Sequence, residues 1–311
     1  MSERDGGIKE FSGDPSRRPA VPVRKKRRQS YEFLRFICMF FVVASHVDQP
    51  RFFGFTALSI FIILSVRLSG GSLATKPFSE VFRTRVSRIL IPWLIWCVIY
   101  EAVKVYQFGP SALTFTDPNS LLIGSTIHLW FLVYMVLITP IIYLAVRAPR
   151  NAIGFAAVMG VFSLLGLGAV FLEMRASLPE PYSQWALALP PTSYGLLAAD
   201  FPAVLPLALL AMLVALAMAL KGYLIAGYLA LSAVVLWLAD HIDLPGTWAE
   251  TLGATTFGIY LSHQLIILLC YKLIPFEAGR WLMTVIAFSS ATIFVFAYQR
   301  IKPGLKRLLT H

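Results

Sequence analysis

Long apolar segments recur along almost the whole chain. Nine clear segments are each close to the roughly 20 residues that a membrane helix needs: residues 31–48, 52–68, 89–107, 127–146, 152–172, 203–220, 222–239, 252–274 and 281–299. A tenth segment, from Trp185 to Ala199, is apolar but contains Pro190 and Pro191, which membrane helices tolerate when neighbouring groups satisfy the freed carbonyls. This pattern predicts an all-α, polytopic integral membrane protein with about ten transmembrane helices.

The composition agrees with lipid as the solvent. Apolar residues make up 58% of the 311 residues and charged residues 14%, whereas a soluble domain is about half apolar and about a quarter charged. This excess excludes a soluble enzyme and a disordered protein. Cys38, Cys97 and Cys270 are widely spaced within apolar runs and form neither a disulfide framework nor a metal-binding spacing. We therefore expect buried thiols, no metal site and no permanently bound cofactor.

Basic residues predict the orientation. The net charge is +11, and nine of the 27 Lys and Arg residues lie in the first thirty positions, directly before the first apolar segment. Cytoplasmic loops carry such an excess. Arg300, Lys302, Lys306 and Arg307 follow the last span and are cytoplasmic only if there are ten spans. The sequence thus favours ten spans with both termini cytoplasmic, over nine.

The two ends of the chain differ from its middle. Residues 1–30 are rich in Pro, Gly and charge, which predicts a disordered basic cytoplasmic tail. No aromatic residues are interleaved with their basic run, so we expect a lipid bilayer and no nucleic acid as the partner. Residues 31–300 form the predicted transmembrane domain, and residues 301–311 a short basic cytoplasmic tail.

The first span contains two polar residues that lipid disfavours, Arg35 and His46. They are eleven residues apart, which on a helix is about three turns and about 16 Å, so both face the same way. One helix would thus present a cation near the cytoplasm and an imidazole at greater depth. The alternative is a snorkelling arginine and a hydrogen-bonded core histidine.

Arg85 and Arg88 follow the second span and share a helix face. Arginine binds phosphate oxygens bidentately, so these residues and Arg35 would form a cytoplasmic cluster suited to a polyphosphate ligand. The alternative is positive-inside charge without a ligand.

Further polar residues occur near or within later spans. His128 and Trp130 open the fourth span, where His128 is expected at the membrane interface, and Tyr260 and His263 lie in the penultimate span. His263 needs a polar partner there. The remaining polar groups have structural interpretations: an ion pair between Glu101 and Lys104, and a solvated loop for Asp240, His241 and Asp243.

Four motifs, in this order, resemble the acyltransferase 3 family of bacterial membrane O-acyltransferases. They are Arg35 and His46 with ten residues between them, Arg85-x-x-Arg88 followed by Pro92, His128-Leu-Trp-Phe-Leu, and Gly258-Ile-Tyr-Leu-Ser-His263. The resemblance covers residues 31 to about 300. Two features depart from the family: no Gly follows Ser65, and Glu32 replaces an Asp.

The resemblance implies an O-acyltransferase that moves an acyl group, by default acetyl, from cytosolic acyl-CoA to a hydroxyl of a cell-envelope glycan such as exopolysaccharide or lipopolysaccharide. It implies a bacterial inner-membrane location, His46 as the catalytic residue, and Arg35, Arg85 and Arg88 as the acyl-CoA-binding arginines. Acyl-CoA is then a donor substrate. We assign acceptor contacts more weakly to His128, Trp130, Tyr260 and His263.

Other functions use the same buried polar residues differently. A glycan or lipid transporter or flippase would need them without acyl chemistry, and a structural membrane protein would not need them at all. His46 has an ordinary pKa near 6.5, which suits removal of a proton from a hydroxyl. The sequence leaves open whether His46 acts as a general base or carries the acyl group transiently.

Overall fold

The computed structural model describes residues 28–47, 51–115, 119–147, 152–176, 178–200, 204–274 and 279–309. Within these ranges all regular elements are helices, which confirms the prediction of an all-α fold. The predicted disordered tail lies outside the described residues as far as residue 27, and so do the last two residues of the predicted C-terminal tail.

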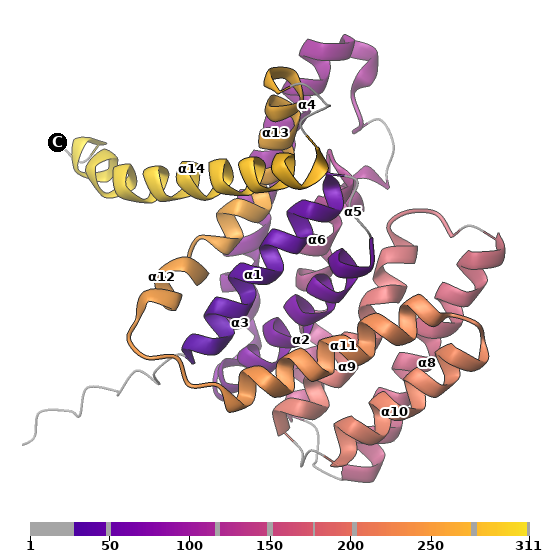
Figure 1. Cartoon of the computed structure of the whole chain (residues 1–311). Helices are drawn as coiled ribbons and strands as arrows, with labels where there is room; N and C mark the ends of the chain where they lie inside the picture. Colours follow the sequence, from indigo (N-terminus) through magenta and orange to yellow (C-terminus); the bar gives the residue numbers. More distant parts are fainter. Residues whose placement is uncertain are drawn as a thin grey trace, which may run out of the picture.

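Ten helical segments of the described chain coincide with the ten predicted spans (Figure 1). Three of them are interrupted by a short turn or a change of helix type. Pro190 and Pro191 lie inside the sixth segment without ending it. The segments are α1 (Gln29–His46), α2 (Arg51–Thr75), α3 (Phe78–Arg85) with η1 (Val86–Leu90) and α4 (Ile91–Phe108), η3 (Ile127–Leu129) with α6 (Trp130–Leu137) and α7 (Thr139–Arg147), α8 (Ala152–Ala176), α9 (Tyr182–Asp200), α10 (Val204–Ala219), α11 (Tyr223–His241), α12 (Trp248–Gly253) with α13 (Thr256–Leu273), and α14 (Arg280–Leu309).

Seven helices in the described ranges are long and apolar enough to cross a membrane, so the protein is a multi-pass membrane protein. Of the other three segments, α10 is apolar but shorter, and α1 and α9 carry more polar residues. The count of ten spans stays a prediction. The seven are Phe52–Thr75, Phe78–Phe108, Ile127–Arg147, Gly154–Phe171, Tyr223–His241, Thr256–Leu273 and Arg280–Ile301.

Helices α1 and α2 lie at the centre of the fold. They pack on each other, and α1 also contacts α12, α13 and α14 while α2 contacts α9 and α11. Figure 1 shows α8 to α11 on one side of this pair and α12 to α14 on the other. Met39, Val43 and Leu64 are fully buried between these groups. The two central helices therefore position any site that lies between the halves.

The start of α1 and a residue in the second half of α14 contact the same short segment. The Gln29 side chain at the start of α1 accepts a hydrogen bond from the Glu250 amide at 3.0 Å. Near the end of α14, the Gln299 side chain donates to the Ala254 carbonyl at 3.1 Å. Both partners lie at α12, so the start of α1 and residue 299 occupy the same end of the bundle. This arrangement favours an even number of spans.

We therefore expect a reporter fused after Thr310 to remain in the cytoplasm. The physical reason is the basic charge in the last third of α14, together with the end of the bundle that the start of α1 and residue 299 share. Alkaline phosphatase at this position should be inactive and a fluorescent protein should fluoresce. A fusion after Lys221, between α10 and α11, should give the opposite pattern and serves as the control. An active phosphatase after Thr310 would contradict ten spans and favour nine.

The solvated-loop prediction is wrong for Asp240 and His241, which form the last turn of α11. The Asp240 carboxylate lies 2.9 Å from Arg67 of α2 and 3.0 Å from Arg28 before α1, and it accepts a hydrogen bond from the Tyr31 hydroxyl. Two cations compensate for the cost of a carboxylate at a helix C-terminus. The cluster joins α11 to the two N-terminal helices, from which it is distant in sequence.

The predicted basic C-terminal tail, residues 301–311, begins inside a helix. Helix α14 continues to Leu309, so residues 301–309 are helical and extend away from the other helices (Figure 1). The apolar positions 301, 305, 308 and 309 repeat at helical spacing among the basic residues, which is the pattern of an amphipathic helix.

Two other expectations are confirmed. Cys38, Cys97 and Cys270 are free and buried. Glu101 and Lys104 form an ion pair with 3.7 Å between Oε1 and Nζ. Thr114 completes this pair, because its amide and hydroxyl both donate to the Glu101 carboxylate.

Candidate active site

Two adjoining cavities lie between the central helices. The arginine cavity, of about 600 Å³, is lined by Arg35, Arg85 and Arg88 among others. The histidine cavity, of about 360 Å³, is lined by His46 and His128 among others. The structure thus separates the predicted cation cluster from the predicted histidines but makes their cavities neighbours. Four residues line both cavities: Val42, Leu58, Phe131 and Tyr260.

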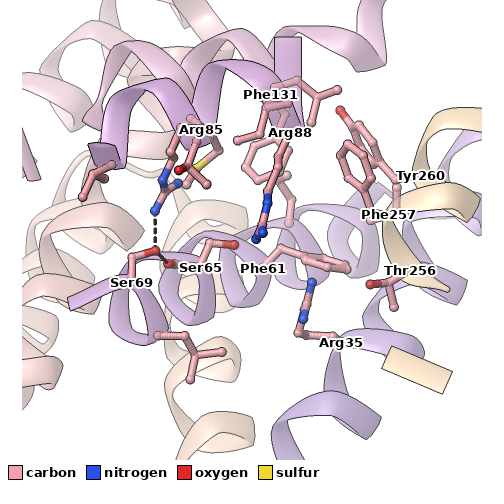
Figure 2. Close-up of a pocket in the computed structure, with 18 of the residues that line it drawn as sticks. Arg35, Phe61, Ser65, Ser69, Arg85, Arg88, Phe131, Thr256, Phe257 and Tyr260 are labelled. Atoms are coloured by element: carbon pink, nitrogen blue, oxygen red, sulfur yellow. Dashed lines mark hydrogen bonds between the residues drawn. The ribbon is translucent and has the colours of Figure 1, made fainter. Parts of the chain in front are cut away.

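Two helical segments bring the arginines together: α1 carries Arg35, and the segment of α3 and η1 carries Arg85 and Arg88. Figure 2 shows Arg35 and Arg88 extending toward each other from opposite walls, while Arg85 points to Ser69 and donates a hydrogen bond to its hydroxyl. Lys76, which follows α2, also lines this cavity. Four basic side chains around one cavity create a region of positive potential that an anionic ligand would neutralise.

A π-helical turn, Val86–Leu90, carries Arg88. Pro92 follows it in the first turn of α4. Proline has no N–H to donate to the carbonyl of Arg88 four residues earlier, and its ring crowds that carbonyl, so a widened turn before it relieves the conflict. The turn also changes the register between Arg85 and Arg88, and both face the cavity. Such turns occur frequently at functional sites.

Arg35 is held by a carboxylate on its own helix. Its guanidinium lies 3.2 Å from the Glu32 carboxylate, whose side chain is only 4% exposed. Gly253 of α12 packs directly on Glu32, because a Cβ at residue 253 would collide with that carboxylate. The acidic residue that departs from the family pattern therefore still orients the arginine, and it also sets the approach of α12 to α1.

Three histidines from three separate helical segments form a cluster. The ring centroid of His263 lies 4.7 Å from that of His128 and 5.0 Å from that of His46, and those of His46 and His128 are 6.0 Å apart. His128 is 5% exposed, so it is buried among these rings rather than facing an interface with solvent. The structure thereby joins one predicted catalytic residue to two residues that we assigned to the acceptor.

Several imidazole nitrogens of this cluster have no hydrogen-bond partner within the described residues. These are both nitrogens of His128 and Nε2 of His263. The other nitrogen of His263, Nδ1, lies 2.7 Å from the Tyr260 carbonyl oxygen, which fixes the ring. Buried polar atoms are nearly always hydrogen-bonded. The cluster is therefore ready to bind hydroxyl groups.

Tyr260 connects the two cavities. Its ring lies in both walls, and its hydroxyl donates to the His128 carbonyl. Trp130 lines the histidine cavity beside His128. The four residues assigned to acceptor contacts, His128, Trp130, Tyr260 and His263, thus surround one region.

Close packing of α1 against α2 places His46 at the wall of the histidine cavity. Gly54 near the start of α2 lies against Ser45, and an added Cβ would be 2.6 Å from the Ser45 hydroxyl oxygen. Small residues allow this approach of helices.

At the level of Ser65, where the chain lacks the family's glycine, Gly195 of α9 packs on Ile63 and Val66 instead. The small residue is therefore supplied by the partner helix.

Four of the lining residues that the sequence analysis missed bear on the chemistry of the cavities. Lys76 and Thr256 line the arginine cavity, and Glu180 and Gln184 line the histidine cavity. Glu180 lies in the turn just before α9 and Gln184 in the first turn of that helix, and Gln184 Nε2 donates to Glu180 Oε1 at 3.3 Å. Nothing in the sequence showed that these two residues adjoin His46.

The fold and the site define a class: multi-pass helical membrane proteins with a basic cavity next to buried histidines. A family model described as an acyltransferase domain, that of the acyltransferase 3 family, matches residues 28–300. The chain therefore belongs to this family, and it is an acyltransferase. No curated protein and no solved structure gives a significant match to the chain.

Proposed function

We propose that this acyltransferase moves an acyl group, by default acetyl, from cytosolic acyl-CoA to a hydroxyl of a cell-envelope glycan such as exopolysaccharide or lipopolysaccharide. It would act in the bacterial inner membrane. The observation that carries the proposal is the adjacency of the two cavities: a basic cavity suited to an anionic donor shares four wall residues with a cavity that contains His46.

The donor fits the arginine cavity chemically. Coenzyme A carries a diphosphate and a 3′-phosphate, and guanidinium groups form short, charge-assisted hydrogen bonds to phosphate oxygens. Phe61 and Phe257 supply apolar surface beside the arginines for the pantetheine arm (Figure 2). The arm would then carry the thioester along α1, from Arg35 toward His46.

The transfer step needs a base and a path for one proton. His46 removes the proton from the acceptor hydroxyl, and the oxygen attacks the thioester carbonyl. A C–O bond forms, the C–S bond breaks, and the coenzyme A thiolate leaves and takes the proton from His46. A positioned base of this kind typically contributes about 10²–10⁴-fold to the rate. An acyl-histidine intermediate would use the same residue and the same atoms.

A transporter or flippase for envelope glycans is the competing function. It would use the histidine cavity to bind a glycan but would not need four basic residues around a neighbouring cavity. The family match also favours transfer. The arginine cavity therefore weighs against transport without chemistry.

Purified protein with labelled acetyl-CoA tests the proposal. We expect acetyl-CoA to bind and coenzyme A to be released in the presence of envelope glycan from the source cells, with the label recovered on the glycan. Mass spectrometry of glycans from cells with and without the protein should show the same acetyl difference. Protein that neither binds nor consumes acetyl-CoA would contradict the donor assignment.

A further inference from the structure

We propose that the histidine cavity binds the acceptor as an uncharged sugar ring, and that Glu180 and Gln184 of the α9 region select it. This inference rests on the proposed function, because it assigns the acceptor side of that reaction. It adds a binding site, a substrate class and two specificity residues that neither the sequence motifs nor the family match identify.

The cavity's position suits an acceptor that arrives from the side opposite to the donor. Its lining includes His46 at the end of α1, Gly54 near the start of α2, His128 just before α6, and Glu180 and Gln184 at the start of α9. The arginine cavity is lined from the opposite ends of these helices, for example by Arg35 early in α1 and Ser69 late in α2. The two substrates would therefore approach from opposite ends of the bundle.

The polar groups match hydroxyls. Glu180 Oε1 accepts a hydrogen bond from Gln184 Nε2 at 3.3 Å, and Gln184 Oε1 accepts one from Ser183 at 2.9 Å. A carboxylate has about four acceptor positions and an amide both donates and accepts, so this pair retains capacity for neighbouring hydroxyls of a ring. His128 adds two buried ring nitrogens without a partner in the described residues.

Size and aromatic surface match a sugar. A volume of about 360 Å³ lies near the lower end of ligand cavities, which span roughly 300–1,000 Å³. It suits a small ligand unit better than a long lipid chain. Trp130 and Phe55 line the same cavity, and aromatic faces pack against apolar C–H surface while polar groups bind the rim.

Charge decides against an anionic acceptor. The residues that line the histidine cavity include the Glu180 carboxylate but neither Lys nor Arg, whereas four basic residues line the arginine cavity. An acidic sugar would meet like charge from Glu180 without a cation to neutralise it. A cationic sugar would have to shed the water around its ammonium group in a cavity whose other lining residues carry no formal charge. A neutral ring avoids both costs.

The experiment uses full-length protein in proteoliposomes with labelled acetyl-CoA and three probes: methyl glucoside, methyl glucuronide and methyl glucosaminide. We expect acetylation of the glucoside at least tenfold faster than that of the glucuronide.

Glu180→Gln should raise the KM for the glucoside about five- to twentyfold and reduce the difference between the two sugars to about threefold. Gln184→Leu is the second variant and should raise the same KM. Asp243→Asn, an exposed carboxylate outside both cavities, is the matched control.

The outcomes separate this inference from the function on which it rests. Equal rates for glucuronide and glucoside, or a glucoside KM that neither variant changes, would overturn the inference. So would wild-type protein that hydrolyses acetyl-CoA but acetylates none of the three sugars, or one that prefers the glucosaminide. Wild-type protein that does not consume acetyl-CoA at all would instead contradict the proposed function.

Discussion

Replacing His46 with glutamine should reduce acyl transfer by at least a hundredfold, while the protein still inserts into the membrane and still binds acyl-CoA. Loss of a general base typically costs about 10²–10⁴-fold in rate, and more if the histidine also carries the acyl group. Binding should persist because Arg35, eleven residues and about 16 Å earlier on the same helix, lies in the other cavity. Glutamine keeps a polar side chain but cannot act as a base.

The two neighbouring histidines are the natural comparators. His263→Gln and His128→Gln should retain measurable turnover, because one nitrogen of His263 is held by the Tyr260 carbonyl and His128 is assigned to contacts with the acceptor in the histidine cavity. Expression, acyl-CoA binding and turnover should be measured on the same purified sample. Turnover by His46→Gln within a few-fold of wild type would remove His46 from the mechanism and make His263 the next candidate.

Replacing Arg88 with alanine should raise the KM for acyl-CoA by about ten- to a hundredfold and change the acceptor KM little. A charged hydrogen bond to phosphate contributes about 1.5–3 kcal/mol, which corresponds to this range. Lysine at position 88 should recover only part of the loss, because it cannot reproduce the planar two-donor geometry. Arg83 is exposed in the neighbouring turn and lines neither cavity, so Arg83→Ala is the matched control.

Arg85→Ala should act in the same direction, with a loss of its hydrogen bond to Ser69 in addition. Dephospho-CoA donors resolve which phosphate the arginines contact. If Arg85 and Arg88 bind the 3′-phosphate, their alanine variants should respond less to its removal than wild type does. An identical response to acyl-CoA and dephospho-acyl-CoA in wild type and variants would show that these arginines do not contact the 3′-phosphate.

The helical segments were predictable because they depend on local sequence. An apolar run of about 20 residues specifies a membrane helix wherever it lies in the chain, and even the segment with Pro190 and Pro191 followed this rule. The shared direction of Arg35 and His46 was predictable for the same reason, because helix geometry fixes it. Both residues line cavities on one side of α1.

What depends on tertiary packing was not predictable. From the sequence alone, Asp240 is predicted to lie in a loop, because its partner Arg67 is 173 positions away. The proximity of His128 to His263 arises only when η3 and α13 pack together, and no spacing in the sequence encodes it. Glu180 and Gln184 carry no motif, so only the fold places them beside His46.

The shared wall of Val42, Leu58, Phe131 and Tyr260 has a consequence for the membrane as an insulator. Two polar cavities that enter a bilayer from opposite ends shorten the hydrocarbon path that blocks ions. Here that path narrows to one layer of side chains, three of them wholly apolar and the fourth with its hydroxyl bound to the His128 carbonyl. Most of the electrical potential across the membrane would therefore fall over this layer. An acyl group is uncharged and could pass it, whereas a phosphate could not. The proton that the acceptor hydroxyl loses leaves with the coenzyme A thiol, so each transfer would move one proton across this layer in the opposite direction to the acyl group.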